Sequence, residues 1–391
     1  MKAVILAAGE GSRLRPLTNH RPKPMLPVGN KPLLESIIEA VSAAGIAEIV
    51  LVVGYHRERI QNHFGDGNQW DVDITYAIQE KQLGTGHALL QAEPYIDSDF
   101  IALNGDRYIE SQVIEDLIDE RRQSGWSCIA VTRIDTPNRF GIVELDGQTV
   151  TDIVEKPPAG TTSSRQINAG VYAFGPEIFD SIRETESFGE QALTTTLQTQ
   201  SKVQPLRAIS VTGRWGDVSY PWDLLSLNDY ALDQFQSNPD SEMTQAGHVA
   251  STATLHDDFL LGENVTIHPG AVVLHGTSIG ENVSVGANAV LENVVVFPDA
   301  TIGPGAVVRD SIIGVNATIG PNTTIEGGNT ELTLDGEVHR NVEFGGLVGD
   351  YARLKANITV KPGTVIGEGV GVESGAVVSG RIADNASIVR G

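Results

Sequence analysis

The chain of 391 residues shows two successive patterns of apolar and polar positions. Up to about residue 230, short apolar runs alternate with segments in which apolar residues have helical spacing. The predicted strands are residues 3–6, 48–53, 100–103 and 128–132, and the predicted helices are residues 33–44 and 112–124. This alternation is typical of an α/β domain with a mostly parallel sheet covered by helices.

Small or acidic residues follow three of the predicted strands. Gly9, Gly54 and Asp106 each come shortly after an apolar run. Because ligands of parallel α/β sheets bind at the carboxyl ends of the strands, we expect these residues to border a binding site.

Beyond residue 248 the apolar positions follow a six-residue period. The periodic residues are Leu261, Ile267, Val273, Ile279, Val285 and Leu291, and later Val348, Leu354, Val360, Ile366, Val372 and Val378. This period predicts a parallel β-helix, because the strands of a sandwich recur less regularly, about every 8–12 residues. Residues 327–344 break the period and are expected to loop out of a coil.

The change of pattern divides the chain into two predicted domains. Residues 1–233 form the first, residues 234–247 a polar linker, and residues 248–391 the β-helix. Two domains also agree with the length, since single cores rarely grow beyond roughly 250–300 residues.

Charge narrows the classes of partner. The net charge is −23, which disfavours nucleic acid and anionic membranes as partners. With 19 arginines and eight lysines, the composition resembles that of proteins from salt-rich cytoplasm, where screening relieves self-repulsion. An acidic protein without salt adaptation is the alternative.

The sequence indicates a cytoplasmic protein. Cys128 is the only cysteine and lies in an apolar strand, so an inert core thiol is expected. The apolar stretch after Met1 is too short for a signal peptide, and no run reaches the roughly 20 apolar residues of a membrane span.

The most informative segment is the loop after the first strand. Its glycines expose backbone N–H groups, and Arg13 and Lys23 follow, which together suit a polyphosphate. A dinucleotide fingerprint would need a third glycine where Leu14 stands, and the Lys-Ser/Thr ending of a P-loop is absent. An ordinary strand-to-helix turn is the alternative.

Residues 6–28, from Leu-Ala-Ala-Gly-Glu-Gly-Ser-Arg to Arg-Pro-Lys-Pro-Met-Leu-Pro-Val, resemble the signature of the sugar-1-phosphate nucleotidylyltransferases. The resemblance implies a Rossmann-like domain that joins a nucleoside triphosphate to a sugar 1-phosphate and releases pyrophosphate. The nucleotide-binding residues that it implies are Leu6, Ala8, Gly9, Gly11, Ser12, Gln79, Gly84 and Thr85. Arg13 would hold the leaving pyrophosphate, and Lys23 would bridge the α-phosphate and the sugar phosphate.

The segment from Gln79 to Ala88 resembles the part of this family that binds the base. Gln79 can offer a donor and an acceptor to the imide edge of a pyrimidine. The Gly-Thr-Gly-His-Ala sequence is most similar to that of uridylyltransferases, so UTP is expected first and dTTP second.

Two carboxylates match the family's metal-binding positions. Asp106 follows a strand, and Asp217 lies in the Arg-Trp-Gly-Asp segment. Each alone is the type of carboxylate found in turns, but as a pair in this family they imply Mg²⁺. Arg107 departs from the family pattern, which usually has an uncharged residue there; it would contact phosphate or point into solvent.

Three segments would form the sugar pocket. By resemblance, Gly141 allows a close approach of the sugar, Glu155 and Asn168 bind its hydroxyls or N-acetyl group, and Lys156 binds its phosphate. The sequence leaves open whether the substrate is glucose 1-phosphate or N-acetylglucosamine 1-phosphate.

The second domain resembles the left-handed hexapeptide β-helix, which often assembles into trimers or larger homo-oligomers. Similar archaeal enzymes are bifunctional and also acetylate glucosamine 1-phosphate from acetyl-CoA. Residues 344–355 resemble their acetyl-transfer region but contain no histidine. The candidates for such a site are His339, Tyr351, Asn357 and Lys361.

Three functions therefore stay open: a nucleotidylyltransferase whose β-helix serves assembly or regulation, a bifunctional enzyme, and a non-catalytic regulatory subunit. The presence of Arg13, Lys23, Asp106 and Asp217 argues against the last.

Overall fold

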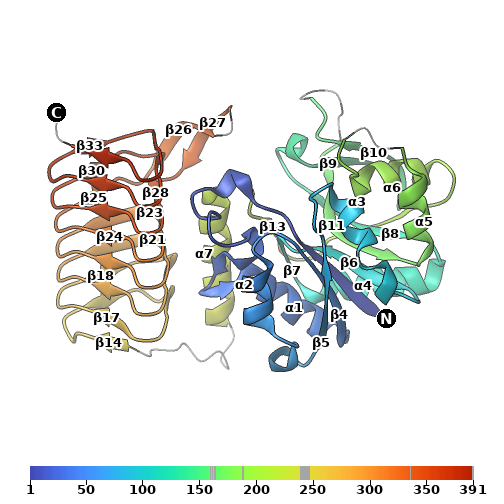
Figure 1. Ribbon diagram of the computed structural model, residues 1–391, viewed down its shortest axis with the longest axis horizontal. Coiled ribbons are helices and arrows are strands. Elements are labelled where there is room, and N and C mark those ends of the chain that lie inside the picture. Colours follow the sequence, from blue (N-terminus) through green and yellow to red (C-terminus); the bar gives the residue numbers. More distant parts are fainter. Residues whose placement is uncertain are drawn as a thin grey trace. The chain divides into compact units, whose positions relative to one another are not determined.

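The computed structural model describes residues 1–158, 160, 162, 164–186, 189–237, 247–334 and 336–389 (Figure 1). The chain divides into two compact units. The first comprises Met1–Glu10, Arg21–Met25 and Leu33–Asp217, and the second comprises Gly11–His20, Leu26–Pro32 and Val218–Gly391.

A nine-stranded sheet forms the centre of the first unit. In spatial order its strands are β5 (Asp73–Ile78), β4 (Glu48–Val53), β1 (Lys2–Ala7), β6 (Phe100–Asn104), β11 (Gln166–Phe174), β8 (Cys128–Arg133), β12 (Arg207–Ser210), β10 (Thr149–Glu155) and β9 (Gly141–Asp146). The neighbours from β5 to β6 are parallel, as are β8 and β12, whereas β11, β10 and β9 pair antiparallel. The predicted α/β class is confirmed, with the antiparallel strands gathered in one half of the sheet.

Six α-helices accompany this sheet in the described part of the unit. They are α1 (Leu33–Ala43), α2 (Arg57–Phe64), α3 (Thr85–Leu90), α4 (Ser111–Ser124), α5 (Glu177–Glu184) and α6 (Leu193–Ser201). Side chains alternate between the faces of a strand, so β1 supplies Ala3 and Ile5 to one apolar core and Val4 to the other. Burial on both faces explains why the central strands are apolar throughout.

The second unit contains a parallel β-helix. Its short strands stack in three groups. The first group is β14 (Gly247–Val249), β17 (Val265–Ile267), β20 (Ser284–Val285), β22 (Thr301–Ile302), β24 (Thr318–Ile319), β29 (Arg353–Leu354), β32 (Gly371–Val372) and β35 (Ser387–Ile388). The second group is β15 (Thr254–Leu255), β18 (Val272–Val273), β25 (Thr324–Ile325), β30 (Thr359–Val360) and β33 (Val377–Val378), and the third is β16 (Phe259–Leu261), β19 (Thr277–Ile279), β28 (Gly346–Val348), β31 (Thr364–Ile366) and β34 (Arg381–Ile382). The long strands β21 (Val290–Val296) and β23 (Val307–Ile313) pair with members of the second and third groups.

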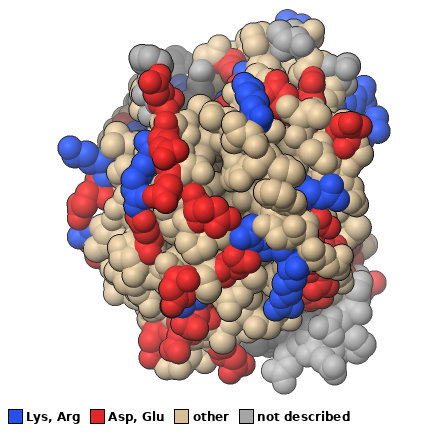
Figure 2. All heavy atoms as spheres, turned by 90° about the vertical axis from the view of Figure 1, so that its right-hand side faces the viewer, with Lys and Arg blue, Asp and Glu red and all other residues tan. Residues whose placement is uncertain are grey.

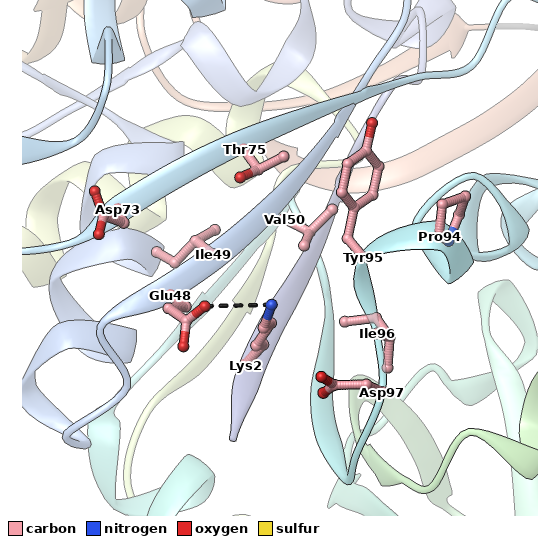
Figure 3. A pocket seen from close by; sticks show the side chains of 10 residues that line it. All are labelled: Lys2, Glu48, Ile49, Val50, Asp73, Thr75, Pro94, Tyr95, Ile96 and Asp97. Carbon is pink, nitrogen blue, oxygen red and sulfur yellow. Dashed lines mark ion pairs between the residues drawn. The ribbon is translucent and has the colours of Figure 1, made fainter.

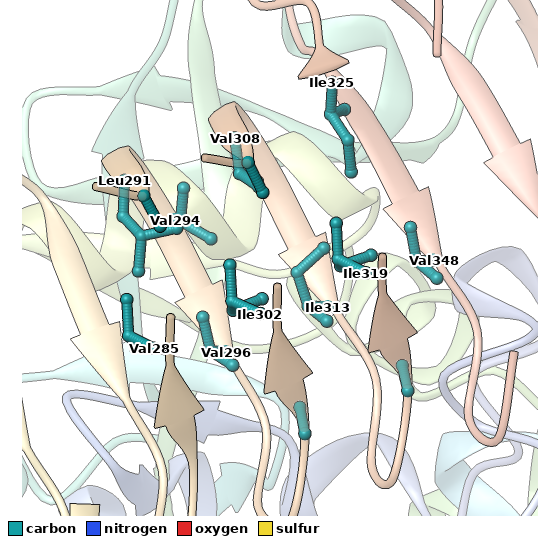
Figure 4. Packing of buried hydrophobic residues seen from close by; sticks show 14 of the residues in the cluster. Val285, Leu291, Val294, Val296, Ile302, Val308, Ile313, Ile319, Ile325 and Val348 are labelled. Atoms are coloured by element: carbon teal, nitrogen blue, oxygen red, sulfur yellow. The ribbon is translucent and has the colours of Figure 1, made fainter. Parts of the chain in front are cut away.

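Stacked apolar side chains fill the β-helix. Val272 pairs with Thr254 of one coil and with Val290 of the next, so each of these coils advances the chain by 18 residues. Figure 4 shows the resulting layers, in which Val285 and Ile302 and likewise Val308 and Ile325 lie in successive coils. The apolar period in the sequence therefore marks the positions that point inward.

Asparagines hold the corners of the coils. Asn264 and Asn282 adopt positive φ, which asparagine tolerates better than most residues, and Asp299 stacks below them in the same conformation. Asn264 Nδ2 donates to Asn282 Oδ1 at 3.2 Å, and Asn282 Nδ2 donates to Asp299 Oδ1 at 3.0 Å. These ladders provide hydrogen bonds to side-chain amide and carboxylate groups that the turns would otherwise leave without a partner.

The interruption of the period forms a hairpin. Residues 327–344 contain β26 (Asn329–Leu334) and β27 (Glu337–Glu343), which pair antiparallel and leave the coil, as predicted. Gly328 N donates to Asp310 Oδ2 at 2.9 Å, which fixes the base of the hairpin to the β-helix.

Helix α7 (Pro221–Ser237) belongs to the second unit, so the predicted boundary at residue 233 falls inside a helix. Residues 238–246 of the predicted linker lie outside the described residues. Asn228, fully buried on α7, accepts from Gly29 N at 3.1 Å and from Ser278 Oγ at 2.8 Å, and it donates to Gly276 O at 3.1 Å. This side chain joins α7 to the β-helix.

Replacing Asn228 with alanine should lower the free energy of unfolding of the second unit by about 2–4 kcal/mol, because buried groups lose their partners. Urea unfolding followed by circular dichroism measures the change. Ser226→Ala, at an exposed position of the same helix, is the matched control and should change stability little. Equal stability of the two variants would contradict the assigned role of Asn228.

The remaining sequence expectations concern the surface and the thiol. None of the described helices combines the length and the hydrophobicity that a membrane span requires. Acidic side chains are spread over the face in Figure 2, with basic ones between them. Cys128 is buried, and burial raises the pKa of its thiol to about 12, as expected of an inert core cysteine.

Candidate active site

Two carboxylates and one ammonium group meet at an edge of the first unit. Asp106 follows β6, and Asp217 ends β13 (Trp215–Asp217), which pairs antiparallel with β7 (Arg107–Ile109). Lys23 Nζ lies 2.7 Å from Asp106 Oδ2 and 3.3 Å from Asp217 Oδ1. The structure thus brings together three side chains that lie far apart in the sequence.

The positive neighbours keep the Asp106 carboxylate ionised. Burial by itself raises the pKa of Asp106, but the nearby Arg107 and Lys23 charges outweigh burial and hold this pKa far below its usual range. A carboxylate that stays charged although it is partly buried is suited to binding a cation.

The donor set fits a magnesium ion. A single nitrogen, Lys23 Nζ, reaches both carboxylates, so a cation at a similar place would be held by the same oxygens. Asn104 Oδ1, two residues before Asp106, is buried and makes no hydrogen bond within the described part of the chain. Mg²⁺ prefers such hard oxygens and usually binds one or two carboxylates together with substrate phosphate. No group of three His, Cys, Asp or Glu suited to a metal occurs among the described residues.

Arg107 lies between these carboxylates and an aromatic pair. Its Nη1 donates to Asp217 Oδ1, and its Nε lies 3.7 Å from Asp106 Oδ1. The guanidinium carbon lies 5.5 Å from the centre of the Phe140 ring and 5.4 Å from that of Trp215. With its side chain only 13% exposed, Arg107 does not point into solvent, and its contact with phosphate stays a prediction.

The predicted base-binding residues are held as one group. Gln79, which follows β5 and is 5% exposed, donates through Nε2 to Gly84 O at 3.2 Å and contacts His87 Nδ1 at 2.9 Å. Thr85 Oγ1 accepts from Leu193 N at 3.0 Å. His87 was not among the predicted site residues, although it lies in the segment that indicated the base site.

Gly84 is required at its position for two reasons. Its φ is +105°, and a Cβ there would lie 2.6 Å from the carbonyl oxygen of Gln191. Gly86 N donates to that same oxygen at 2.8 Å. The glycines therefore let the base-binding turn lie against the segment that leads into α6.

The predicted sugar-binding segments also converge. Gly141 begins β9 opposite Glu155, the last residue of β10. A Cβ on Gly141 would lie 3.1 Å from Glu155 Oε2 and 3.7 Å from Asn168 Cβ, so all three residues border one space. Lys156 Nζ lies 3.7 Å from Glu155 Oε1, on an exposed turn.

Two further residues border this space and were not predicted from the sequence. The sequence around Tyr172 does not indicate a role in the site. The Tyr172 hydroxyl lies 2.8 Å from Asn168 Nδ2, and burial raises the pKa of this hydroxyl to about 12. Thr194 in α6 has a methyl group 3.3 Å from the Cβ position of Gly141, and its Oγ1 is buried without a hydrogen bond within the described residues. Tyr172 lies four residues after Asn168 in β11, whereas only the fold brings Thr194 to the sugar segments.

The phosphate loop is divided between the two units. In the first unit, Ala8 O accepts from Gln82 Nε2 at 3.1 Å, and Leu6 O accepts from Gly105 N at 2.9 Å. In the second unit, Gly11 has φ +64°, and Ser12–Leu14 form one turn of 3₁₀ helix with Leu14 buried. Ser12 and Arg13 are exposed on this turn.

The candidate acetyl-transfer residues are placed separately in the second unit. His339 packs against Tyr220 and Trp222, with ring centres 4.5 and 5.1 Å away. Lys361 Nζ pairs with Glu326 at 2.9 Å. Tyr351 and Asn357 occupy corner positions with positive φ. The acetyl-transfer role of His339 stays a prediction, and its ring packs against Tyr220 and against Trp222 of α7.

A pocket lies at the other edge of the sheet (Figure 3). Lys2, Glu48 and Asp73 line it from the amino ends of β1, β4 and β5, and Lys2 Nζ pairs with Glu48 Oε2 at 3.2 Å. Because parallel α/β sheets bind ligands at the carboxyl ends, we place the active site at the opposite edge, where the predicted residues gather.

The chain is similar to known proteins over most of its length. The nucleotidyl transferase family model matches residues 2–234, and the GMPPB C-terminal domain model matches residues 255–383. The bifunctional protein GlmU of Methanococcus vannielii is 32% identical over 94% of this chain and 92% of its own. The low-salt glycan biosynthesis nucleotidyltransferase Agl11 of Haloferax volcanii is 36% identical over 75% of this chain and 85% of its own.

A solved structure shares the fold of part of this chain. The UDP-glucose pyrophosphorylase crystallised with UDP-glucose superposes with a TM-score of 0.55 at 23% identity, over 60% of this chain and 98% of that one. The family match spans more than half of the chain and includes Lys23, Asp106 and Asp217. The chain therefore belongs to the nucleotidyl transferase family and is a sugar-phosphate nucleotidyltransferase.

Proposed function

We propose that this enzyme transfers the nucleotidyl group of UTP, with dTTP as the second choice, to glucose 1-phosphate or N-acetylglucosamine 1-phosphate. The observation that carries the proposal is the joint contact of Lys23 with Asp106 and Asp217. These groups provide the charges that an attack of one phosphate on another requires.

The reaction needs no protein nucleophile. An oxygen of the ionised sugar phosphate forms a bond to the α-phosphorus, and the bond from this phosphorus to the bridging oxygen of the β-phosphate breaks. The electron pair leaves with pyrophosphate, so no proton has to move. Catalysis then consists of holding two anions in line and neutralising their repulsion.

Asp106 and Asp217 would hold Mg²⁺, with Asn104 Oδ1 as a neighbouring oxygen. Bound there, the ion would neutralise phosphate charge and orient the triphosphate. Lys23 places its ammonium group beside the same carboxylates and would contact the α-phosphate and the sugar phosphate. Arg13 and the amides of the phosphate loop would hold the leaving pyrophosphate.

The hydrogen bonds of Gln79 support a uracil or thymine base. Its Nε2 donates to Gly84 O and faces His87 Nδ1, while Oε1 makes no hydrogen bond within the described residues. An amide oxygen in this position can accept from the imide N–H of uracil or thymine, whereas cytosine has only an acceptor at that ring position.

Pyrophosphate release tests this assignment. UTP, dTTP and GTP are each combined with glucose 1-phosphate and with N-acetylglucosamine 1-phosphate, in high salt with Mg²⁺. UTP should give the highest kcat/KM and dTTP the next. A preference for GTP would overturn the base assignment, and no pyrophosphate with any pair would support the regulatory-subunit alternative.

The β-helix is proposed to serve assembly of a homo-oligomer, a trimer or larger, which light scattering of the purified protein would measure. The bifunctional alternative makes a different prediction, since acetyl transfer to glucosamine 1-phosphate releases the thiol of coenzyme A. Thiol release at a rate comparable to pyrophosphate release would favour that alternative.

A further inference from the structure

We propose that Arg107 binds the phosphate of the incoming sugar 1-phosphate, as a third cation besides Lys23 and Lys156, and so sets the affinity of the enzyme for that substrate. The proposal rests on the proposed function, because it assigns a role within the same site.

The hydrogen bonds of the guanidinium leave one side available. Nη1 donates to Asp217, and Nε lies near Asp106 without a hydrogen bond within the described part of the chain. Nη2 makes no hydrogen bond to any described residue. Because the guanidinium is a planar fork of donors, the fixed Nη1 leaves Nη2 in a defined direction, suited to a phosphate oxygen.

Aromatic rings hold this cation independently of the carboxylates. Phe140 and Trp215 meet edge to face with ring centres 5.5 Å apart, and both contact the Arg107 guanidinium. Trp215 is itself fixed, since its Nε1 donates to Ala169 O at 2.8 Å. Arg107 would therefore stay in place when its neighbouring carboxylates bind a metal ion instead.

These contacts assign Arg107 to the sugar side of the site. Phe140 directly precedes Gly141, and Ala169 directly follows Asn168, so both belong to predicted sugar-binding segments. A Cβ on Gly170 would lie 3.3 Å from Arg107 Nε, which shows how closely this segment passes. No contact to the Gln79 segment occurs among the described residues. A phosphate that enters with the sugar therefore meets Arg107.

The alternative is that Arg107 only neutralises the carboxylates before a metal binds. Arg107→Gln separates the two roles. Loss of a phosphate contact should raise the KM for the better of the two sugar phosphates by about 10- to 100-fold, with little change in the KM for UTP. Loss of a counter-ion alone would lower the Mg²⁺ concentration needed for half-maximal activity and leave the KM for the sugar phosphate unchanged.

Two further variants make the test decisive. Arg107→Lys keeps the positive charge but loses the planar fork of donors, so its KM for the sugar phosphate should lie between those of wild type and Arg107→Gln. If circular dichroism shows that Arg107→Gln does not fold, the KM of Arg107→Lys tests the proposal in its place. Arg165→Gln is the control, because Arg165 is exposed and pairs with Asp135 away from these residues.

Calorimetry provides a readout that does not depend on turnover. Glucose 1-phosphate and N-acetylglucosamine 1-phosphate are titrated into enzyme with Mg²⁺ and a non-hydrolysable UTP analogue. Arg107→Gln should weaken binding by the same factor as the KM. Unchanged binding, or equal weakening of the UTP analogue, would overturn the proposal. Inactivity of the wild type with every substrate pair would instead contradict the proposed function.

Discussion

Replacing Asp217 with alanine is expected to lower kcat by about 10³-fold or more, because the enzyme loses half of its predicted metal-binding carboxylates. The side chain is only 5% exposed and contacts both Lys23 and Arg107. Its removal leaves two partly buried cations beside the single carboxylate of Asp106. Pyrophosphate release measured over a series of Mg²⁺ concentrations checks the result.

The same titration separates a metal ligand from a structural residue. If Asp217 binds Mg²⁺, Asp217→Asn keeps the shape of the side chain but should need a higher Mg²⁺ concentration for half-maximal activity. Asp119→Ala, on the exposed side of α4, serves as the control. An Asp217→Asn enzyme with unchanged Mg²⁺ dependence and normal kcat would remove this residue from the metal site.

Arg13→Ala should lower turnover by roughly 10²–10³-fold, the usual effect of losing one electrostatic contact in a transition state. The residue is exposed on the 3₁₀ turn, while the next residue, Leu14, anchors that turn in the core. The substitution should therefore leave stability almost unchanged, and its effect on kcat reports chemistry rather than folding. Steady-state kinetics together with thermal unfolding measure both quantities.

Arg15 offers a matched control for Arg13. It is an exposed arginine in the same loop and is not among the predicted site residues. Arg15→Ala should retain most of the turnover. Near-normal activity of Arg13→Ala, or equal losses in both variants, would contradict the specific role of Arg13 in holding pyrophosphate.

The strands and the β-helix were predictable because their signals are local. Strand β1 is apolar at successive positions, since both faces of the sheet are covered, and the six-residue period follows from inward-pointing side chains in each coil. The carboxyl-end residues Gly9 and Asp106 were likewise placed by a general rule for parallel sheets. The place of helix α7 in the second unit was not predicted, because nothing in its sequence shows that it packs on the β-helix.

Partners across long sequence separations were less predictable. Arg107 stood out as a departure from the family pattern, but its contacts with Phe140 and Trp215 depend on the pairing of β7 with β13. His339 was a candidate catalytic base because of its residue type and its place in the loop before residues 344–355. Its packing against Tyr220 and Trp222 depends on how the hairpin folds, which the sequence did not indicate.

The sequence by itself determined the α/β domain and the β-helix and predicted the chemistry of the site, because periodicity and short motifs are properties of neighbouring residues. Only the tertiary structure decided that Lys23 reaches both Asp106 and Asp217, and that Gln79 is held by Gly84 and His87. Such distances depend on how the strands order and pair in the sheet, which no local segment encodes alone.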